Sequence, residues 1–276
     1  MQHYLQTLAV ALLLTGPALA QNTNQTPYQT KTFATNGLTT VRVETSGGSI
    51  AVEGDHAGEA KVEVYVQPNN QNGSQTLSQA ELDERLSSYV ITVETQGNTL
   101  VATARRKDNR NIMNWRNGVS IAFRVYVPRR MTTDLHTSGG SISLSHLASS
   151  QKFEISGGSL NMIDLDGNTQ GRTSGGSINL NNCRPMVDVE TSGGSVEAEM
   201  VSVGKFVRLS ASSGSVRVRM PLDKGLDLDL RGNRVNVPQP LSGFSGSIEK
   251  DRVWGQLNGG GIPVVLSASS GSVSMN

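Results

Sequence analysis

The sequence is poor in cysteine, in aromatic residues and in excess charge of either sign. It holds one cysteine among 276 residues, which excludes a disulfide framework and a cysteine-rich zinc or iron–sulfur site. The 24 Lys and Arg residues are balanced by 23 Asp and Glu residues, a composition that is neither that of a general nucleic-acid binder nor that of an acidic tail. Aromatic residues make up 4% and glycines number 30, which predicts a thin core of small branched side chains with many tight corners.

The first twenty residues have the pattern of a cleaved signal peptide. Residues 8–14 (LAVALLL) form an apolar run, a Gly-Pro pair breaks it, and residues 18–20 (ALA) supply the small residues that a signal peptidase reads. The run is shorter than the about 20 residues of a membrane span. The segment before it has no Lys or Arg, so the alternative is a buried N-terminal helix. We expect a signal peptide over 1–20, a disordered linker over 21–30 and an exported mature chain without a transmembrane segment, located in the periplasm, on the cell surface or outside the cell.

A Ser-Gly-Gly-Ser phrase followed by an aliphatic residue repeats along the chain. Four copies follow one another at a spacing of 18 residues, and a related copy comes 20 residues later. A fixed period is typical of repeat folds in which each unit buries its apolar face only against its neighbours. The copies begin at Ser46, Ser138, Ser156, Ser174 and Ser192, with SSGS variants at Ser212 and Ser269.

Apolar and polar residues alternate after each phrase, and a further apolar column precedes it. The alternation predicts strands with one buried face, so each unit is strand, turn, strand. We expect the two glycines to supply backbone conformations that side chains would forbid. The inward columns are Ile142, Leu160, Ile178, Val196 and Val216; Leu144, Met162, Leu180, Ala198 and Val218; and Leu135, Phe153, Val189 and Leu209, interrupted by Gly171.

A column of charged residues indicates that the units stack in register. His136, Glu154, Arg172 and Glu190 stand two positions before successive phrases and alternate in sign. In a parallel stack they would lie about 4.8 Å apart, where alternation avoids like-charge repulsion. The expected fold is therefore all-β, a single-stranded β-solenoid of parallel stacked coils. We expect it to be right-handed, because parallel crossovers usually are.

The N-terminal part follows the same pattern less regularly. We expect one solenoid domain over 31–276, made of an irregular β part over 31–134 with loops and one short helix, and of regular repeats and C-terminal strands over 135–276. The clearest alternation runs from Val119 to Val127, where Pro128 ends it.

The short helix is predicted from Ser78 to Ser88. Ser78 followed three residues later by Glu81 is a capping-box pattern, and three leucines, Leu77, Leu82 and Leu86, are spaced to pack beneath the helix.

At the repeated corners the chain resembles a known family. The TSGGSI-type corners after a signal peptide, together with the C-terminal phrase LNGGGIPVVLSASSGSV, are similar to those of the bacterial "putative adhesin" β-strand-repeat family. The resemblance covers roughly residues 30–276. It implies an extracytoplasmic, non-enzymatic β-solenoid and offers no catalytic residues to carry over.

No catalytic or metal-binding motif is recognisable, so we expect no catalytic residue, no cofactor and no metal. The chain has no GxSxG elbow and no HxH or HExxH spacing, and the SGGS serines recur as corner residues. Residues 164–168 (DLDGN) resemble the start of a calcium loop, but Gly175 stands where its glutamate should be, which favours a solvated turn. Asp227 and Asp229 share one strand face, as acid–base chemistry on a polysaccharide would require, although ordinary exposed alternation explains them equally well.

The lone cysteine has a structural explanation. Cys183 shares its place in the repeat with Leu147, Leu165 and Val201. We therefore expect a small inward-facing hydrophobe whose thiol is unreactive, because burial in apolar surroundings disfavours the thiolate.

One segment, from Arg105 to Arg130, carries a local excess of positive charge. The candidate binding residues within it are Arg105, Arg106, Lys107, Arg110 and Trp115. They are expected either to contact an anionic polysaccharide or a protein of the cell envelope, or simply to discourage pairing at a strand edge. Nucleic acid is not expected as a partner, because the chain is predicted to be exported.

Two functions follow from these observations. The favoured one is an exported, non-catalytic, adhesin-like interaction or scaffold protein of the bacterial cell envelope, and the alternative is a polysaccharide-active β-solenoid enzyme, a lyase or hydrolase. A third possibility, an ice- or crystal-binding face, would need paired threonine columns. One such column is present, made of Thr137, Thr173 and Thr191 and interrupted by Ile155.

Overall fold

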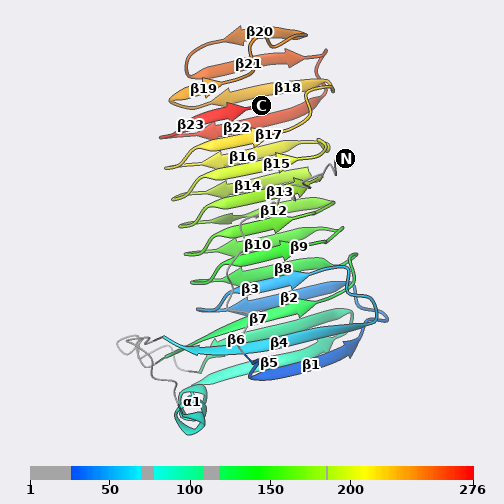
Figure 1. Cartoon of the computed structure of the whole chain (residues 1–276), viewed down its shortest axis with the longest axis vertical. Helices are drawn as coiled ribbons and strands as arrows, with labels where there is room; N and C mark the ends of the chain where they lie inside the picture. Colours follow the sequence, from blue (N-terminus) through cyan, green and yellow to red (C-terminus); the bar gives the residue numbers. More distant parts are fainter. Residues whose placement is uncertain (1–25, 70–77, 108–117, 185) are drawn as a thin grey trace, which may run out of the picture.

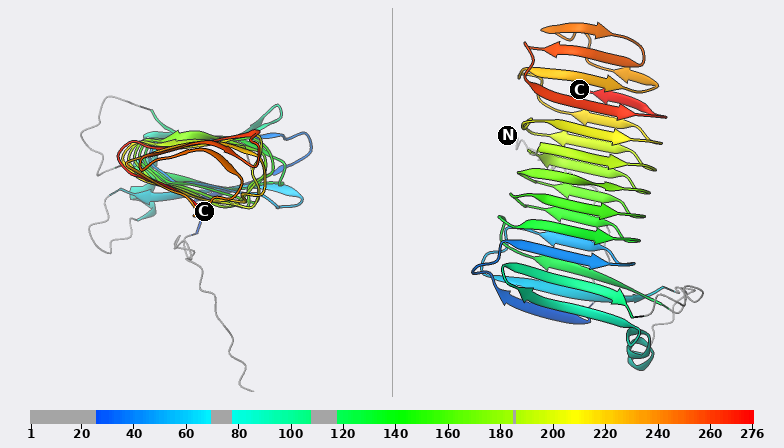
Figure 2. Two further views of the ribbon diagram at one scale, coloured as in Figure 1. Left: turned by 90° about the horizontal axis from the view of Figure 1, so that it is seen from above. Right: turned by 180° about the vertical axis from the view of Figure 1, so that it is seen from behind.

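Strands build almost the whole of the described chain. The computed structural model describes residues 26–69, 78–107, 118–184 and 186–276, so the predicted signal peptide lies outside the described residues. Within them, the strands β1 to β23 form two sheets that face each other across one core, and a single helix, α1, lies at one end (Figures 1 and 2). No helix of the described part is long and apolar enough to cross a membrane.

Sheet A has eleven strands and sheet B has twelve. In spatial order, sheet A contains β1 (Gln29–Ala34), β4 (Glu59–Pro68), β7 (Val119–Tyr126), β3 (Ile50–Glu53), β9 (Ile142–Ser145), β11 (Leu160–Ile163), β13 (Ile178–Cys183), β15 (Val196–Met200), β17 (Val216–Arg219), β23 (Ser272–Met275) and β19 (Arg234–Asn236). Sheet B contains β20 (Phe244–Ile248), β21 (Arg252–Leu257), β18 (Leu226–Arg231), β22 (Ile262–Ala268), β16 (Val207–Ala211), β14 (Met186–Thr191), β12 (Asn168–Thr173), β10 (Gln151–Ile155), β8 (Thr132–Thr137), β2 (Thr40–Thr45), β6 (Thr99–Arg106) and β5 (Tyr89–Gln96).

Each repeat unit is one coil, defined here as a sheet B strand, its corner and the following sheet A strand. Neighbouring coils pair in parallel with the register that the 18-residue spacing predicts. Leu160 pairs with Ile142 on one side and Ile178 on the other, and Glu154 lies between His136 and Arg172. The predicted strand–turn–strand units and their stacking are confirmed, whereas the right-handed winding stays a prediction.

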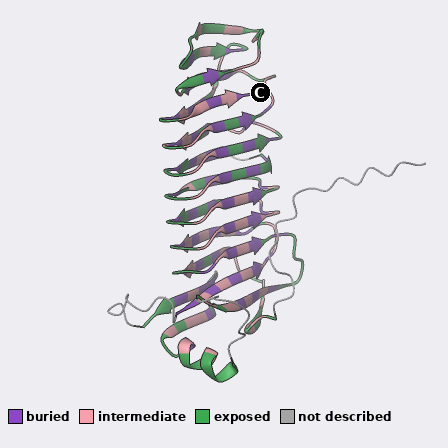
Figure 3. Ribbon diagram, turned by 60° about the vertical axis from the view of Figure 1, so that its left-hand side comes forward, coloured by how far each residue is buried: buried purple, intermediate pink, exposed green. Residues whose placement is uncertain are grey.

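The predicted inward columns form the core. Every member of the three columns is at most 3% exposed, and buried and exposed residues alternate along the strands (Figure 3). The cluster of buried apolar side chains extends from Val41 to Met275, so the irregular N-terminal coils and the regular repeats share one core. Strand β7 buries its apolar alternation, as its sequence predicts.

The order of coils in the stack departs from their order in the chain at both ends. The last coil, β22–β23, lies between the coils β16–β17 and β18–β19, since Val264 pairs with both Val207 and Leu228. The first coil, β2–β3, is likewise enclosed between β8–β9 and the coil that contains β6 and β7. Antiparallel strands cover the two ends, with β1, β4 and β5 at one end and β21 and β20 at the other. The expected solenoid of parallel stacked coils therefore needs correction at its ends, where strands pair antiparallel and the coils do not follow chain order.

Helix α1 (Gln79–Leu86) forms as its capping pattern predicts. The Ser78 backbone N–H donates to the Glu81 carboxylate at 2.9 Å, and the Ser78 hydroxyl accepts from the Glu81 N–H at 3.4 Å. Leu86 is buried and Leu82 packs against the core, while Leu77 lies outside the described residues. Strand β1 begins at Gln29, where its pairing with β4 holds Gln29 opposite Val64. The expected linker over 21–30 therefore extends two residues into this strand.

Candidate functional site

The corner serines form a ladder of hydrogen bonds along the stack. The backbone N–H of the last serine in a corner donates to the hydroxyl oxygen of the equivalent serine in the neighbouring coil. The N–O distances are 3.2 Å for Ser159 to Ser141, 3.3 Å for Ser177 to Ser159, 3.2 Å for Ser195 to Ser177, 3.1 Å for Ser215 to Ser195 and 3.1 Å for Ser272 to Ser215. The repeated serine is therefore a structural residue of every corner in this series.

The threonine column is buried and holds neighbouring corners together. Thr137, Thr173 and Thr191 are 4%, 1% and 0% exposed, so the column cannot present a flat face to ice or a crystal. Each hydroxyl donates to the carbonyl of the second glycine in the neighbouring corner, as Thr191 does to Gly176 at 2.6 Å. It also accepts the N–H of the second glycine of its own corner. This role was missed from the sequence, although the recurrent threonine before SGGS was its signal.

The second corner glycine is required by close stacking and not by an unusual backbone angle. None of the SGGS glycines has a positive φ. A Cβ at Gly140 would overlap with the carbonyl group of Gly48 in the neighbouring coil, whereas a Cβ at the first glycine, Gly139, would lie no closer than 3.5 Å to its neighbours. The expectation that both glycines supply forbidden conformations is therefore wrong. The two SSGS variants agree with the stacking, because they replace the first glycine and keep the second.

Another column of corners does adopt left-handed backbone conformations. His146, Asp164 and Asn182, each 18 residues apart, have φ values of 56°, 51° and 55° at the ends of sheet A strands. Asn, Asp and His are the non-glycine residues that tolerate this region best. Asp164 lies 3.1 Å from the guanidinium of Arg129 and 3.4 Å from that of Arg184, and the bond to Arg129 lowers the pKa of its carboxyl group. Both arginines thus pair with the carboxylate that the calcium-loop pattern singled out. No group of three or more potential metal ligands occurs in the described part of the chain.

Cys183 is buried as predicted, but the predicted column is wrong at one position. Cys183 is 0% exposed and burial raises the pKa of its thiol. Leu147 and Leu165 are buried too, whereas Val201 is 46% exposed. Met200 takes the inward place beside Cys183 instead, because the register shifts between Leu180 and Cys183.

Three of the five predicted arginine-rich binding residues lie within the described chain. Arg105, Arg106 and Lys107 lie at the end of β6, and Arg110 and Trp115 lie outside the described residues. The Arg105 guanidinium forms an ion pair with Glu44, and the Lys107 amine donates to the Ser87 carbonyl at 2.6 Å.

The outer face of sheet B carries charges that neutralise one another. Its ion pairs join neighbouring strands, as the predicted charge column implied, and Arg172 lies 2.8 Å from Glu154. Further pairs across neighbouring strands are Arg42–Asp134 at 3.3 Å, Arg105–Glu44 and Arg208–Asp188 at 3.0 Å, and Arg231 lies 2.6 Å from Asp229 within one strand. Exposed pairs of this kind contribute little stability, about 0–1 kcal/mol each. They neutralise most of the charges on this face, although Lys152 and Glu190 have no ion pair in the described residues.

The two aspartates considered for acid–base chemistry are engaged as well. Asp229 lies 2.6 Å from Arg231 and 3.5 Å from Arg252. Asp227 accepts hydrogen bonds from the Gln256 amide at 3.2 Å and from the Gly261 N–H at 3.0 Å. Both carboxylates therefore serve to hold β18, β21 and the following loop together.

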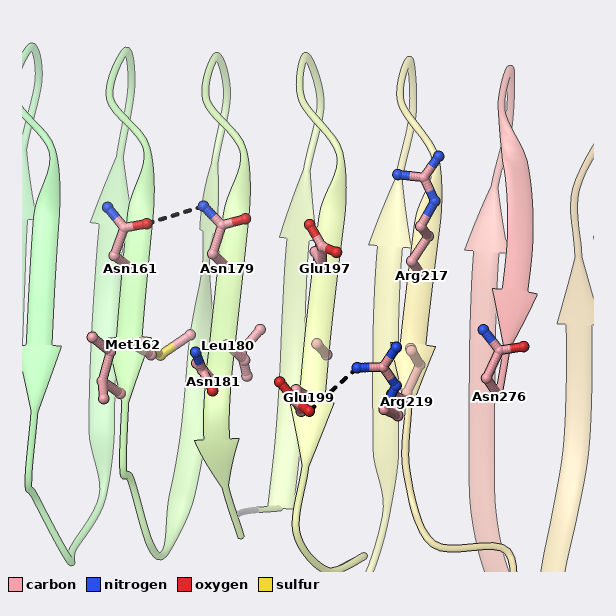
Figure 4. A pocket seen from close by; sticks show the side chains of 13 residues that line it. Asn161, Met162, Asn179, Leu180, Asn181, Glu197, Glu199, Arg217, Arg219 and Asn276 are labelled. Atoms are coloured by element: carbon pink, nitrogen blue, oxygen red, sulfur yellow. Dashed lines mark hydrogen bonds and ion pairs between the residues drawn. The ribbon is translucent and has the colours of Figure 1, made fainter. Parts of the chain in front are cut away.

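The outer face of sheet A is hollowed into a groove of about 500 Å³ (Figure 4). One wall is a register row of side chains from four successive strands, Asn161, Asn179, Glu197 and Arg217. The other wall comes from residues two positions further along the same strands, Ile163, Asn181, Glu199 and Arg219. The floor between them is the backbone of residues whose side chains point into the core, such as Met162 and Leu180. The groove thus runs across the strands, along the axis of the stack.

The groove keeps much of its hydrogen-bonding capacity unused. The Asn179 amide donates to the Asn161 carbonyl oxygen at 3.0 Å, and Arg219 lies 3.4 Å from Glu199. Within the described residues, the side chains of Asn181, Glu197 and Arg217 have no hydrogen bond or ion pair. Figure 4 shows the two rows of side chains on either side of the floor. The sequence revealed these outward positions but gave no sign that they form a groove.

A separate polar cluster lies on β4 and β7, which belong to sheet A like the strands of the groove. The Glu63 carboxylate receives the Lys61 amine at 2.9 Å and the Tyr65 hydroxyl at 2.8 Å, and the Lys61 amine lies 4.1 Å from the centre of the Tyr126 ring. Burial, aided by the bond to Glu63, raises the pKa of Tyr65 to about 12. Burial opposes the charge of Glu63, but the bonds from Lys61 and Tyr65 prevail and lower its pKa. The cluster is internally satisfied and joins the two strands.

Comparison with known proteins gives distant structural likenesses, among them the following two. No known protein family and no curated protein matches the chain. A "putative cell adhesion protein" from Clostridium sporogenes is 13% identical, with 90% of this chain and 97% of that one covered and a TM-score of 0.33. A "putative adhesin" from Bacteroides fragilis is 11% identical, with 90% and 96% covered and a TM-score of 0.44. Similarity this low does not transfer a function to the chain.

Proposed function

We propose that the chain is an exported, non-catalytic scaffold of the bacterial cell envelope that binds a partner through its outward side chains, in the manner of an adhesin. The observation that carries the proposal is the use of the repeated residues. The corner serines, the buried threonines and the second glycines all hold neighbouring coils together. These repeated residues are therefore explained by contacts between coils, and none of them is needed as a repeated catalytic group.

The outward positions support the same proposal. In the row that runs through Ser143, Asn161, Asn179, Glu197 and Arg217, the residue type changes along the stack, while the neighbouring inward positions stay apolar. A rigid repeat stack with varied outward rows is an extended binding surface. The signal-peptide pattern of residues 1–20 supports export.

The arginine-rich segment is proposed as a contact for an anionic polysaccharide or an acidic envelope protein. Arg105 and Arg106 are exposed at the end of β6, next to the segment that contains Arg110 and Trp115. Replacing Arg105, Arg106 and Arg110 with alanine should weaken envelope binding and flatten its salt dependence. Unchanged retention across a salt series would leave these residues with only the role of edge charges.

The proposed function is tested by a pull-down from envelope fractions with the chain from residue 21 as bait. Folded bait should retain a component that unfolded bait does not. Retention of nothing beyond that control would overturn the proposal. Incubation with acidic and neutral polysaccharides tests the enzyme alternative, because new reducing or unsaturated ends would show catalysis.

A further inference from the structure

We infer that the groove on the outer face of sheet A binds a neutral, hydroxyl-rich polysaccharide whose chain lies along the axis of the stack. The inference rests on the proposed binding function and adds to it the site and the chemical class of the ligand. It starts from the contrast between the two outer faces. Most charges of sheet B are paired, largely across neighbouring strands, whereas in the groove of sheet A the side chains of Asn181, Glu197 and Arg217 have no partners in the described residues.

The size and direction of the groove suit a linear polymer. Its volume of about 500 Å³ lies within the range of about 300–1,000 Å³ that is typical of ligand sites. Its walls repeat once per strand, every 4.8 Å or so, over the four strands β11, β13, β15 and β17. Toward β9 the two rows continue as Ser143 and Ser145, whose short side chains leave room for a chain to extend beyond the groove.

The charges of the groove favour a neutral ligand. Its two carboxylates, Glu197 and Glu199, are balanced by the guanidinium groups of Arg217 and Arg219. Side chains with no net charge give neither a polyanion nor a polycation a long-range attraction. The ligand must therefore be held by hydrogen bonds at short range.

The chemistry of the walls matches hydroxyl groups. An asparagine amide both donates and accepts, a carboxylate accepts and a guanidinium donates. A sugar hydroxyl also donates and accepts, so each ring of a polysaccharide can bond to either wall. An extended peptide is a poorer fit, because its side chains on one face recur every two residues, about 6.6 Å, and fall out of step with rungs about 4.8 Å apart.

The test measures binding of the mature protein to defined polysaccharides. Mannan and dextran in affinity electrophoresis and chitohexaose in calorimetry are the neutral probes, and polygalacturonate is the anionic one. The groove variant is Asn161→Ala with Asn179→Ala. The matched control is Lys152→Ala with Gln170→Ala, which removes two exposed side chains from neighbouring strands of sheet B. All four positions point outward, so both variants should keep the parent's melting temperature.

We expect at least one neutral probe to bind the parent and the sheet B control equally, and the groove variant at least tenfold more weakly. Equal binding by the groove variant would overturn the site. Binding of polygalacturonate alone, lost in the groove variant, would overturn the ligand class.

Failure of this inference is distinguishable from failure of the proposed function. If no neutral probe binds while the envelope pull-down retains a protein, the polysaccharide inference is overturned and the binding function is supported. If neither experiment retains anything, both are overturned.

Discussion

The ring of Phe153 fills the space beside Gly171, its partner in the next coil. The two residues pair directly in sheet B, at the one place where the inward column Leu135, Phe153, Val189, Leu209 lacks a side chain. A Cβ at Gly171 would lie 2.7 Å from Cδ2 of Phe153 and would also overlap with the Phe153 carbonyl oxygen. The large and the small residue thus compensate each other within the core.

We expect Gly171→Ala to destabilise the protein by about 1–3 kcal/mol, the range typical of overpacked cores. Adding Phe153→Leu should recover part of this loss and not all of it, because the overlap with the carbonyl oxygen remains. Urea unfolding of the two single variants and the double variant measures the coupling. Additive effects of the two substitutions would contradict the compensation.

The two glycines of one corner should respond differently to the same substitution. Gly140→Ala is expected to lower the Tm by roughly 5–10 °C, because a Cβ would overlap with the Gly48 backbone. Gly139→Ala is the matched control and should change the Tm by no more than about 2 °C, since its Cβ would make ordinary contacts. Similar melting shifts for both variants would show that stacking does not explain the second glycine.

The buried threonines should contribute through their hydroxyl groups. Thr191→Val keeps the shape and removes the bonds to the Gly176 carbonyl and the Gly194 N–H, so we expect a loss of about 1–3 kcal/mol. The reciprocal change is Ile155→Thr, which places a threonine where Ile155 interrupts the column. Ile155 is only 1% exposed, so the new hydroxyl would be buried. It should be tolerated better than Ile155→Ser, which leaves a cavity. Thermal or chemical unfolding checks each variant, and a fully stable Thr191→Val protein would argue against the hydroxyl's role.

The thiol of Cys183 should be unreactive in the folded protein. It is fully buried and its pKa is raised by that burial, so little thiolate forms at neutral pH. We expect slow labelling by a thiol reagent under native conditions and rapid labelling in denaturant. Fast native labelling would contradict the buried position.

Acid should weaken the cluster around Arg129. The bond from Arg129 lowers the pKa of the Asp164 carboxyl from its usual 3.8, so the folded protein binds that proton less readily than the unfolded chain. This contribution is present above pH 3.8 and is lost as the pH falls through the lower folded value. Arg129→Gln should therefore lower the free energy of unfolding at pH 7. It should also make that free energy fall less steeply below about pH 4. Urea unfolding at several pH values measures both effects, and Arg42→Gln, which breaks a more exposed pair with Asp134, is the control.

The sequence predicted the coils well and the corners less well. The columns around Ile178 and the pairing of Glu154 with Arg172 followed from period-two alternation and a constant spacing, both of which are local properties of the chain. Val201 was misplaced because a one-residue shift beside Cys183 changes which side chain faces inward. The capping box of α1 was predictable because all of its groups lie within four residues.

The sequence by itself determined which aliphatic columns of the regular repeats face the core, where their strands turn and that the units stack in parallel. Only the tertiary structure decided that the last coil, β22–β23, lies between β16–β17 and β18–β19. As a result, the Ser272 N–H bonds to the Ser215 hydroxyl, 57 residues away. It also decided that the second glycine is needed for contact, that the threonines lie inside, and that two outward rows enclose a groove. These features arise between coils and not within one, because backbone contacts across the stack depend on which coils become neighbours.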